Sequence, residues 1–293
     1  MFARSLLPCL LLALVCGGPL GAQEDPLDDP LDGPVEPGTS EPEPERVKAS
    51  LVREREHLAP GETHWIGVRL QIVPEWHIYW LNPGDAGVPT EITLKGLPKG
   101  VRAGVTQWPG PHAYEQAGLA SFAYEGEVTA LIQLRVGKDV APGTKIPLEI
   151  SAEWLVCKEA CVPGAATLRA TLEVQAQPGA ERKADSKVIA AARALLPRPL
   201  PQGVRVELKG RTLEVHAEGA SELRYFPLVP RDHAPGLTGL VSKGAKFSVQ
   251  YPPAALKAKQ IKGLLALTRE GHTTYHWISA SPPGAESAAK SKS

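Results

Sequence analysis

The sequence predicts an all-β protein: a β-sandwich, followed by one helix and a second, smaller β-domain. From residue 47 onward the chain consists of short strand-like runs divided by Pro-Gly pairs such as Pro60-Gly61 and Pro142-Gly143. Within 127–136, apolar residues alternate with polar ones, as expected of a strand with one buried face. Only the segment 185–196 has the pattern of a helix.

The strand candidates form two groups separated by the helix. The first group covers 47–53, 63–73, 76–81, 90–95, 101–107, 127–136, 146–156 and 167–174. Its close spacing predicts the sandwich, over 47–176. A helical connector is expected over 177–200, with Asp185 and Ser186 as capping residues and Pro197 as the stop. The second group predicts a small β-domain over 201–281, with strands at 203–209, 211–217, 221–226, 246–250, 261–269 and 273–279.

Both ends of the chain differ in composition from the body. An apolar run after Arg4 and small residues before Gln23 predict a secretory signal peptide over 1–22. The alternative is a lipoprotein signal with Cys16 as the first mature residue. Residues 23–46 alternate acids and prolines, which predicts a disordered linker, and the Ala/Ser/Lys-rich tail 282–293 is expected to fray.

Composition argues against several classes of partner. No stretch after the signal reaches the roughly 18 apolar residues needed to cross a bilayer, so we expect a soluble, exported protein that does not span the membrane. The chain has a formal net charge of zero and no basic stripe with interleaved aromatics. Nucleic acid is therefore not an expected partner.

Cleavage of the signal leaves two cysteines, Cys157 and Cys161, in an oxidation-permissive compartment. The three residues between them fit a tight hairpin loop that could bring the sulfurs together. A loop this short stabilises by only about 2 kcal/mol, against about 4.7 for a hundred-residue loop, which favours a redox-active pair over a structural staple. A soft-metal site is a third alternative, although no zinc-type spacing surrounds the pair and Met1 is the only methionine. No cofactor is expected.

Two aromatic-rich segments are further candidates. Trp76 and Trp80 fall on one face of a predicted strand and are expected in the core, whereas His77 and Tyr79 share the opposite face and are candidates to border a site. The segment 107–126 is interrupted by Pro and Gly and contains several aromatics. It is expected to be a loop that either covers the cysteines or lies plainly on the surface.

Four motifs follow one another along the chain: Trp76-His77-x-Tyr79-Trp80-x-Asn82-Pro83-Gly84-Asp85, Gln107-Trp108-Pro109, Tyr124-x-Gly126-Glu127-Val128 and Trp154-Leu155-Val156-Cys157-x-x-x-Cys161-x-Pro163. Together they resemble the amino-terminal periplasmic domain of the thiol:disulfide interchange protein DsbD, in the variant found in ScsB-like proteins, over about residues 47–175. The resemblance implies an immunoglobulin-like fold with Cys157 and Cys161 as the redox pair. It also implies that Phe122 and Tyr124 match the aromatic cap that shields the pair. The helix and second β-domain resemble the segment that follows in ScsB-like members.

The resemblance further implies a disulfide reductase-type component located in the periplasm. Its cysteines would receive electrons from a membrane-embedded thiol donor and reduce disulfide isomerases, thioredoxin-like proteins of cytochrome c biogenesis or peroxide-handling proteins. The best-known members place five residues between their cysteines, whereas this chain has three. Membrane and thioredoxin-like domains are not found in this sequence, so the donor is expected to be another polypeptide. A copper-stress binding module and a structural sandwich with an inert disulfide remain the rival interpretations.

Overall fold

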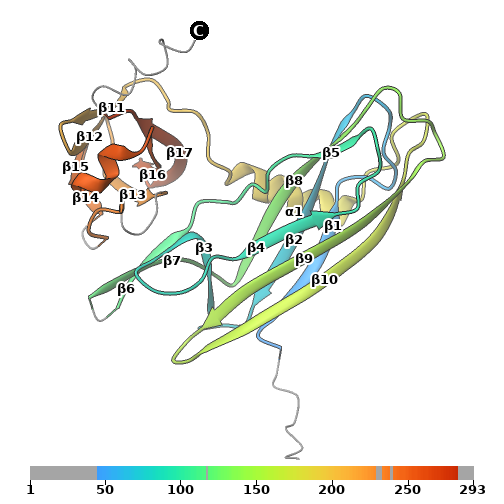
Figure 1. Cartoon of the computed structure of the whole chain (residues 1–293), viewed down its shortest axis with the longest axis horizontal. Coiled ribbons are helices and arrows are strands. Elements are labelled where there is room, and N and C mark those ends of the chain that lie inside the picture. Colours follow the sequence, from blue (N-terminus) through green and yellow to red (C-terminus); the bar gives the residue numbers. More distant parts are fainter. Residues whose placement is uncertain (1–44, 117, 229–232, 238–239, 283–293) are drawn as a thin grey trace, which may run out of the picture. The chain divides into compact units, whose positions relative to one another are not determined.

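The computed structural model describes residues 45–282, except 117, 229–232 and 238–239. The described residues from Glu45 onward belong to one compact unit whose regular elements are mostly strands, which confirms the all-β prediction (Figure 1). The signal peptide, nearly all of the acidic linker and nearly all of the tail lie outside the described residues. Within the described part of the chain, no helix is long and apolar enough to cross a membrane.

Two antiparallel sheets make up the sandwich. The first has the strand order β1-β2-β8-β5, with β1 at Val47–Arg53, β2 at Thr63–Ile72, β8 at Glu127–Val136 and β5 at Val101–Ala103. The second has the order β10-β9-β3-β7-β6, with β4 also paired to β9. Its strands are β10 (Cys161–Glu173), β9 (Lys145–Cys157), β3 (His77–Gly84), β7 (Leu119–Glu125), β6 (His112–Gln116) and β4 (Glu91–Lys95).

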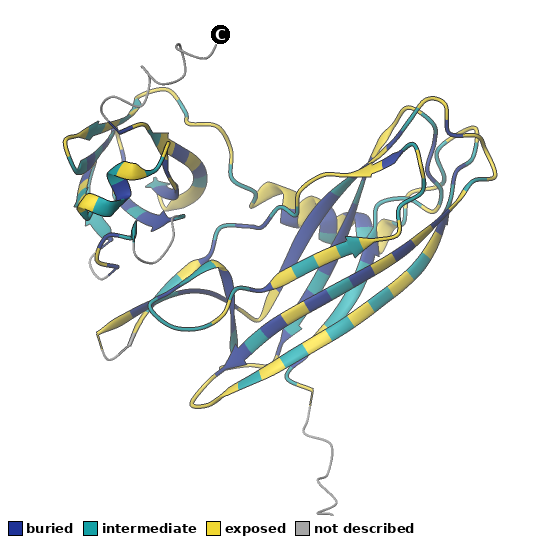
Figure 2. Cartoon of the chain, in the orientation of Figure 1, coloured by how far each residue is buried: buried dark blue, intermediate teal, exposed yellow. Residues whose placement is uncertain are grey.

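The sandwich core follows from alternation along the strands. In β9, Ile146, Leu148 and Ile150 are buried while the residues between them face solvent, a banding that Figure 2 shows along the strand. Successive side chains of a strand point to opposite faces, so one face of each sheet is apolar. In β8, by contrast, the five successive residues Val128–Ile132 are all buried, because helix α1 covers part of its other face.

The helix α1 spans Lys183–Ala194 and packs Ile189 and Ala192 against Val52 and Leu131. Its position agrees with the predicted connector, but the predicted capping is wrong. The helix begins two residues earlier than expected, after Arg182, which makes no side-chain cap. Ser186 instead donates a hydrogen bond to the Glu54 carbonyl at 3.0 Å, so it fastens the first turn of the helix to the end of β1.

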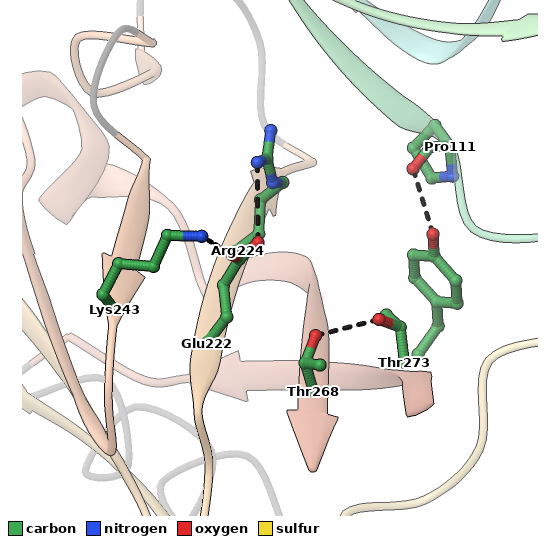
Figure 3. Close-up of polar contacts among 7 residues, drawn as sticks. Pro111, Glu222, Arg224, Lys243, Thr268 and Thr273 are labelled. Carbon is green, nitrogen blue, oxygen red and sulfur yellow. Dashed lines mark hydrogen bonds and ion pairs between the residues drawn. The ribbon is translucent and has the colours of Figure 1, made fainter. Parts of the chain in front are cut away.

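The remaining strands form two further antiparallel sheets, β11-β12-β15 and β14-β13-β16-β17. Their bounds are β11 Val204–Lys209, β12 Thr212–Ala217, β15 Lys246–Gln250, β14 Val241–Lys243, β13 Glu222–Pro227, β16 Ile261–Arg269 and β17 His272–Ala280. Surface pairs such as Glu222 with Lys243 and Arg224 join neighbouring positions on β13 and β14 (Figure 3). A short 3-10 helix, Pro253–Lys257, precedes β16.

Buried residues of these sheets join those of the sandwich in one hydrophobic cluster. Phe226 packs edge-on against Trp80 and Phe122, with ring centroids 6.2 and 5.1 Å away. Asn82 donates a hydrogen bond to the Pro227 carbonyl at 2.6 Å. Tyr275 donates one to the Pro111 carbonyl at 3.3 Å, and Figure 3 shows this contact at Pro111. Whether residues 201–281 fold as a separate domain stays a prediction.

Candidate functional site

A long hairpin brings the two cysteines together. β9 and β10 pair without interruption from Lys145 opposite Glu173 to Cys157 opposite Cys161, and Figure 1 shows them side by side up to the turn. The turn is Lys158-Glu159-Ala160, closed by a hydrogen bond from the Lys158 N–H to the Ala160 carbonyl at 3.2 Å. The cysteine Cα atoms lie 4.1 Å apart, and a disulfide joins the sulfurs. The tight hairpin predicted from the three-residue spacing is therefore present.

The two cysteines of this hairpin differ in exposure. Cys157 lies on an inner strand, with β10 on one side and His77 of β3 directly opposite on the other, and it is only 2% exposed. Cys161 begins the edge strand β10 and is exposed. A thiol that approaches from solvent can therefore reach the Cys161 sulfur more readily than the Cys157 sulfur.

The side chains that gather around Cys157 come from four strands. Tyr79 and Ala123 form a small buried cluster with Cys157, and Tyr114 and Leu155 pack against it half-buried. This cluster lies on the face of the sheet opposite the main core, because residues of alternate parity point to opposite faces. The disulfide is therefore bordered by an aromatic surface that is separate from the sandwich interior.

His77 is the ionisable group nearest to Cys157 in the strand register. Its Nε2 lies 3.2 Å from the Tyr79 hydroxyl, and its ring stacks on Tyr114 with centroids 5.6 Å apart. Burial lowers the pKa of His77, although Glu125 directly opposite it acts in the other direction. Burial raises the pKa of Tyr79 and that of Tyr114, and for Tyr114 a hydrogen bond with Glu125 adds to the shift. The imidazole and both phenols are therefore neutral at neutral pH.

The hairpin turn carries its own ion pair. Lys158 lies 2.9 Å from the carboxylate of Glu75, in the segment just before β3. The hydrogen bond with Glu75 raises the pKa of Lys158. Both side chains are exposed, so solvent screens the pair and its main effect is to connect the turn to the start of β3.

The structure brings His77 and Tyr79 to the cysteines but not Phe122 and Tyr124. Phe122 is 1% exposed and packs on Phe226 in the main core. Tyr124 is also buried, and its hydroxyl donates a hydrogen bond to the Pro109 carbonyl at 2.7 Å. Between them, Ala123 is the residue of β7 that faces Cys157. The proposed match of Phe122 and Tyr124 to a shielding cap is therefore corrected, because both side chains point to the other face of the sheet.

Tyr114 belongs to the segment 107–126, which was expected either to cover the cysteines or to lie plainly on the surface, and it is the residue of this segment that packs at the Cys157 cluster. The segment 107–126, expected to be a loop, instead contains the hairpin β6–β7, in which Tyr114 pairs with Ser121. This pairing carries the Tyr114 ring over His77. The large side chains of Phe122 and Tyr124, two residues apart and separated by small Ala123, were the available signal for a strand here.

Within the ranges that the structure describes, no group of three or more His, Cys, Asp or Glu side chains is arranged to hold a metal ion. The disulfide occupies both cysteine sulfurs. The chemistry that the site presents is therefore that of a sulfur–sulfur bond with one shielded and one accessible end.

Comparison with known proteins finds a family match within the sandwich. Residues 48–173 match the family model described as thiol:disulfide interchange protein DsbD, N-terminal. No curated protein matches the chain. Among solved structures, the N-terminal periplasmic domain of ScsB from Proteus mirabilis is 18% identical with a TM-score of 0.57, covering 83% of this chain and 96% of that one. The N-terminal domain of DsbD from Neisseria meningitidis in the reduced form is 15% identical with a TM-score of 0.24, covering 45% and 89%.

At this level of identity the ScsB structure shows the fold alone. It covers a larger share of the chain than the family segment does, so the fold match includes residues outside 48–173. The expected immunoglobulin-like fold and the stated resemblance are thus confirmed. The family match and the Cys157–Cys161 disulfide together support thiol–disulfide exchange as the general chemistry of the site.

Proposed function

We propose that this protein relays reducing equivalents through Cys157 and Cys161, because residues 48–173 match the DsbD amino-terminal family model. Electrons come from a membrane-embedded thiol protein and pass to periplasmic thioredoxin-like proteins or disulfide isomerases. The observation that carries the proposal is the asymmetric disulfide, with one buried and one exposed cysteine at the tip of an edge hairpin. The periplasmic origin of the ScsB domain supports the location.

Exchange proceeds by two in-line displacements at sulfur. A thiolate of the donor attacks Cys161 Sγ, the bond to Cys157 breaks, and a mixed disulfide joins the donor to Cys161. Cys157 leaves as a thiolate and takes up a proton. A second thiolate of the donor then attacks the donor's own sulfur in the mixed disulfide and releases Cys161. Two electrons and two protons reach this protein, and the donor becomes a disulfide; the acceptor is reduced by the reverse sequence.

The surroundings of Cys157 determine how it behaves as a leaving group. A thiolate in an apolar cluster is disfavoured by desolvation, so a nearby hydrogen-bond donor or acid assists its departure. His77 lies directly opposite Cys157, and a neutral imidazole carries one N–H donor. Residues directly opposite each other in an antiparallel pair have Cβ atoms roughly 4.5–5.5 Å apart. We assign His77 the role of stabilising the Cys157 thiolate.

Two variants and a matched measurement test the proposal. With oxidised glutathione, Cys157→Ala should form a mixed disulfide at the exposed Cys161, and Cys161→Ala should form one at the buried Cys157 far more slowly. Intact-protein mass spectrometry follows both reactions. In the wild type, equilibration with glutathione buffers should give a reduction potential between about −180 and −270 mV, the range of exchange proteins.

A potential below about −300 mV would identify a structural disulfide and contradict the relay. Faster modification of Cys157 than of Cys161 would show that the order of the two sulfurs is reversed. Retention of copper by the reduced protein through gel filtration would favour the soft-metal rival instead.

A further inference from the structure

A groove of about 500 Å³ lies beside the disulfide on the same hairpin. Leu155 of β9 lines it and also packs against the cluster around Cys157. Leu155 is paired with Pro163, two residues along the ladder from the Cys157–Cys161 pair. At about 3.3 Å per residue the groove begins roughly 7 Å from the disulfide. The groove is therefore within reach of the residues next to a partner's cysteine when that cysteine attacks Cys161.

The walls of the groove nearest the disulfide are apolar and open to solvent. Val88 is 54% exposed, and Pro163 on the edge strand is exposed as well. Pro89 and Leu155 complete this part of the lining. Apolar side chains exposed together beside a reactive sulfur favour the burial of an apolar side chain from a binding partner.

The far end of the groove is acidic. Glu91 of β4 and Glu153 of β9 line it and are directly opposite each other, and both are exposed. Like charges in directly opposed positions destabilise a sheet. Among the described residues, neither carboxylate forms an ion pair with a base; Glu153 accepts only a 3.4 Å hydrogen bond from Ser151.

Glu149, a neighbouring carboxylate on the same strand, differs because basic side chains compensate its charge. Glu149 lies opposite Lys95 and pairs with Arg169 at 3.0 Å. The repulsion between Glu91 and Glu153 has no such compensation within the described structure. A basic group supplied from outside would relieve it.

We propose that this groove docks the extended segment beside the reactive cysteine of a partner protein, and that it selects an apolar side chain followed by a lysine or arginine. The inference rests on the proposed function and specifies the partner's chemistry. Along an extended chain, every second side chain points the same way, at about 6.6 Å intervals. Cys161, Pro163 and Ala165 follow this spacing, and Ala165 lies opposite Glu153. The preferred partner therefore carries its apolar residue two positions from its cysteine and its basic residue four positions away.

Peptide thiols test the selection directly. The wild-type disulfide is reduced at low ionic strength by Cys-Ala-Leu-Ala-Lys or Cys-Ala-Leu-Ala-Glu, and by the same sequences in reverse order, with amidated and acetylated ends. In at least one of the two sequence directions, we expect the lysine peptide to react about three- to tenfold faster than its glutamate counterpart. This is the size of effect expected when an exposed lysine contacts two exposed carboxylates. Added salt at about 0.5 M should reduce the preference, because it shortens the screening length.

Variants separate docking from intrinsic thiol reactivity. The two peptides differ in thiol pKa, so the double variant Glu91→Gln/Glu153→Gln provides the reference ratio of rates. In the wild type, the ratio of the lysine-peptide rate to the glutamate-peptide rate should exceed this reference ratio. The variant Glu149→Gln should show the same elevated ratio as the wild type. Val88→Ser should slow both leucine peptides without affecting glutathione, and peptides with serine in place of leucine should not respond to it.

Equal rate ratios in the wild type and in the double variant would overturn the inference, while normal reduction by glutathione would leave the proposed function standing. Failure of every thiol to reduce the wild-type disulfide would reject both together.

Discussion

Replacing Trp80 by alanine should destabilise the protein more than the same change at Trp76, although both were expected in the core from their spacing in the predicted strand 76–81. Trp80 is 1% exposed and packs against Phe226 and Trp277, with ring centroids 6.2 and 6.4 Å away. Trp76 precedes β3 and is half-buried, and the Arg46 guanidinium lies 4.6 Å from the centroid of its ring. The prediction of a core position is confirmed for Trp80, whereas Trp76 is only partly buried and packs against the edge of the same core.

The expected cost at Trp80 follows from the area that its side chain buries. A buried tryptophan removes about 150–250 Å² from water, which at about 25 cal/mol per Å² corresponds to roughly 4–6 kcal/mol. Alanine retains part of this burial free energy, and Trp→Ala or Phe→Ala changes in protein cores cost about 3–5 kcal/mol. For a chain of this size that lowers Tm by roughly 6–20 °C. At Trp76 we expect a smaller cost of about 1–2 kcal/mol, because its side chain is only partly buried at the edge of the core.

Urea denaturation followed by far-UV circular dichroism measures both variants, with equal m-values required for the comparison. The oxidised disulfide should remain reducible by glutathione at the wild-type rate in Trp80→Ala below its transition, because Trp80 and Cys157 lie on opposite faces of the sheet. Equal destabilisation by the two substitutions, or a Trp80→Ala cost under about 1 kcal/mol, would refute the packing argument.

Three further outcomes are expected. Gly84→Ala should cost at least about 2 kcal/mol of unfolding free energy, because Gly84 has φ +91° and a Cβ would lie 2.2 Å from the Ala120 carbonyl oxygen; denaturation midpoints measure this. Burial lowers the pKa of His64 and of His77, so the unfolded chain binds more protons below the usual value of 6.5; stability should fall as pH drops through that value, and His64→Gln should flatten the curve. Tyr114→Ala should accelerate reduction of the disulfide by dithiothreitol, because it uncovers His77 and the cluster around Cys157; an unchanged rate would show that Tyr114 does not shield the site.

The parts of the site that were predictable are local in sequence. A three-residue spacing between cysteines that follow an apolar strand leaves the chain few alternatives to a hairpin, and Cys157 and Cys161 are indeed directly opposite. The strand predicted over 127–136 likewise agrees with the position of β8, although Thr129 and Leu131 on its second face are buried as well. Cys157, which ends an apolar run, is buried, and Cys161, which precedes Val162-Pro163-Gly164, is exposed.

The parts that were not predictable depend on pairings between distant strands. Tyr114 reaches His77 only because β6 pairs with β7 and β7 pairs with β3. The register of β3 against β7 shifts in the segment from Tyr79 to Gly84, and the local sequence pattern does not predict this shift. The acidic pair of Glu91 and Glu153 arises in the same way, from two strands about sixty residues apart in the sequence.

The sequence by itself determined the all-β class, the place of the helix and the joining of the two cysteines, because strand alternation and short loops act over a few residues. Only the tertiary structure decided which side chains surround the disulfide. A shift of one residue in strand register turns every side chain to the other face of the sheet. The packing of distant strands therefore set Ala123 against Cys157, and turned Phe122 and Tyr124 into the core.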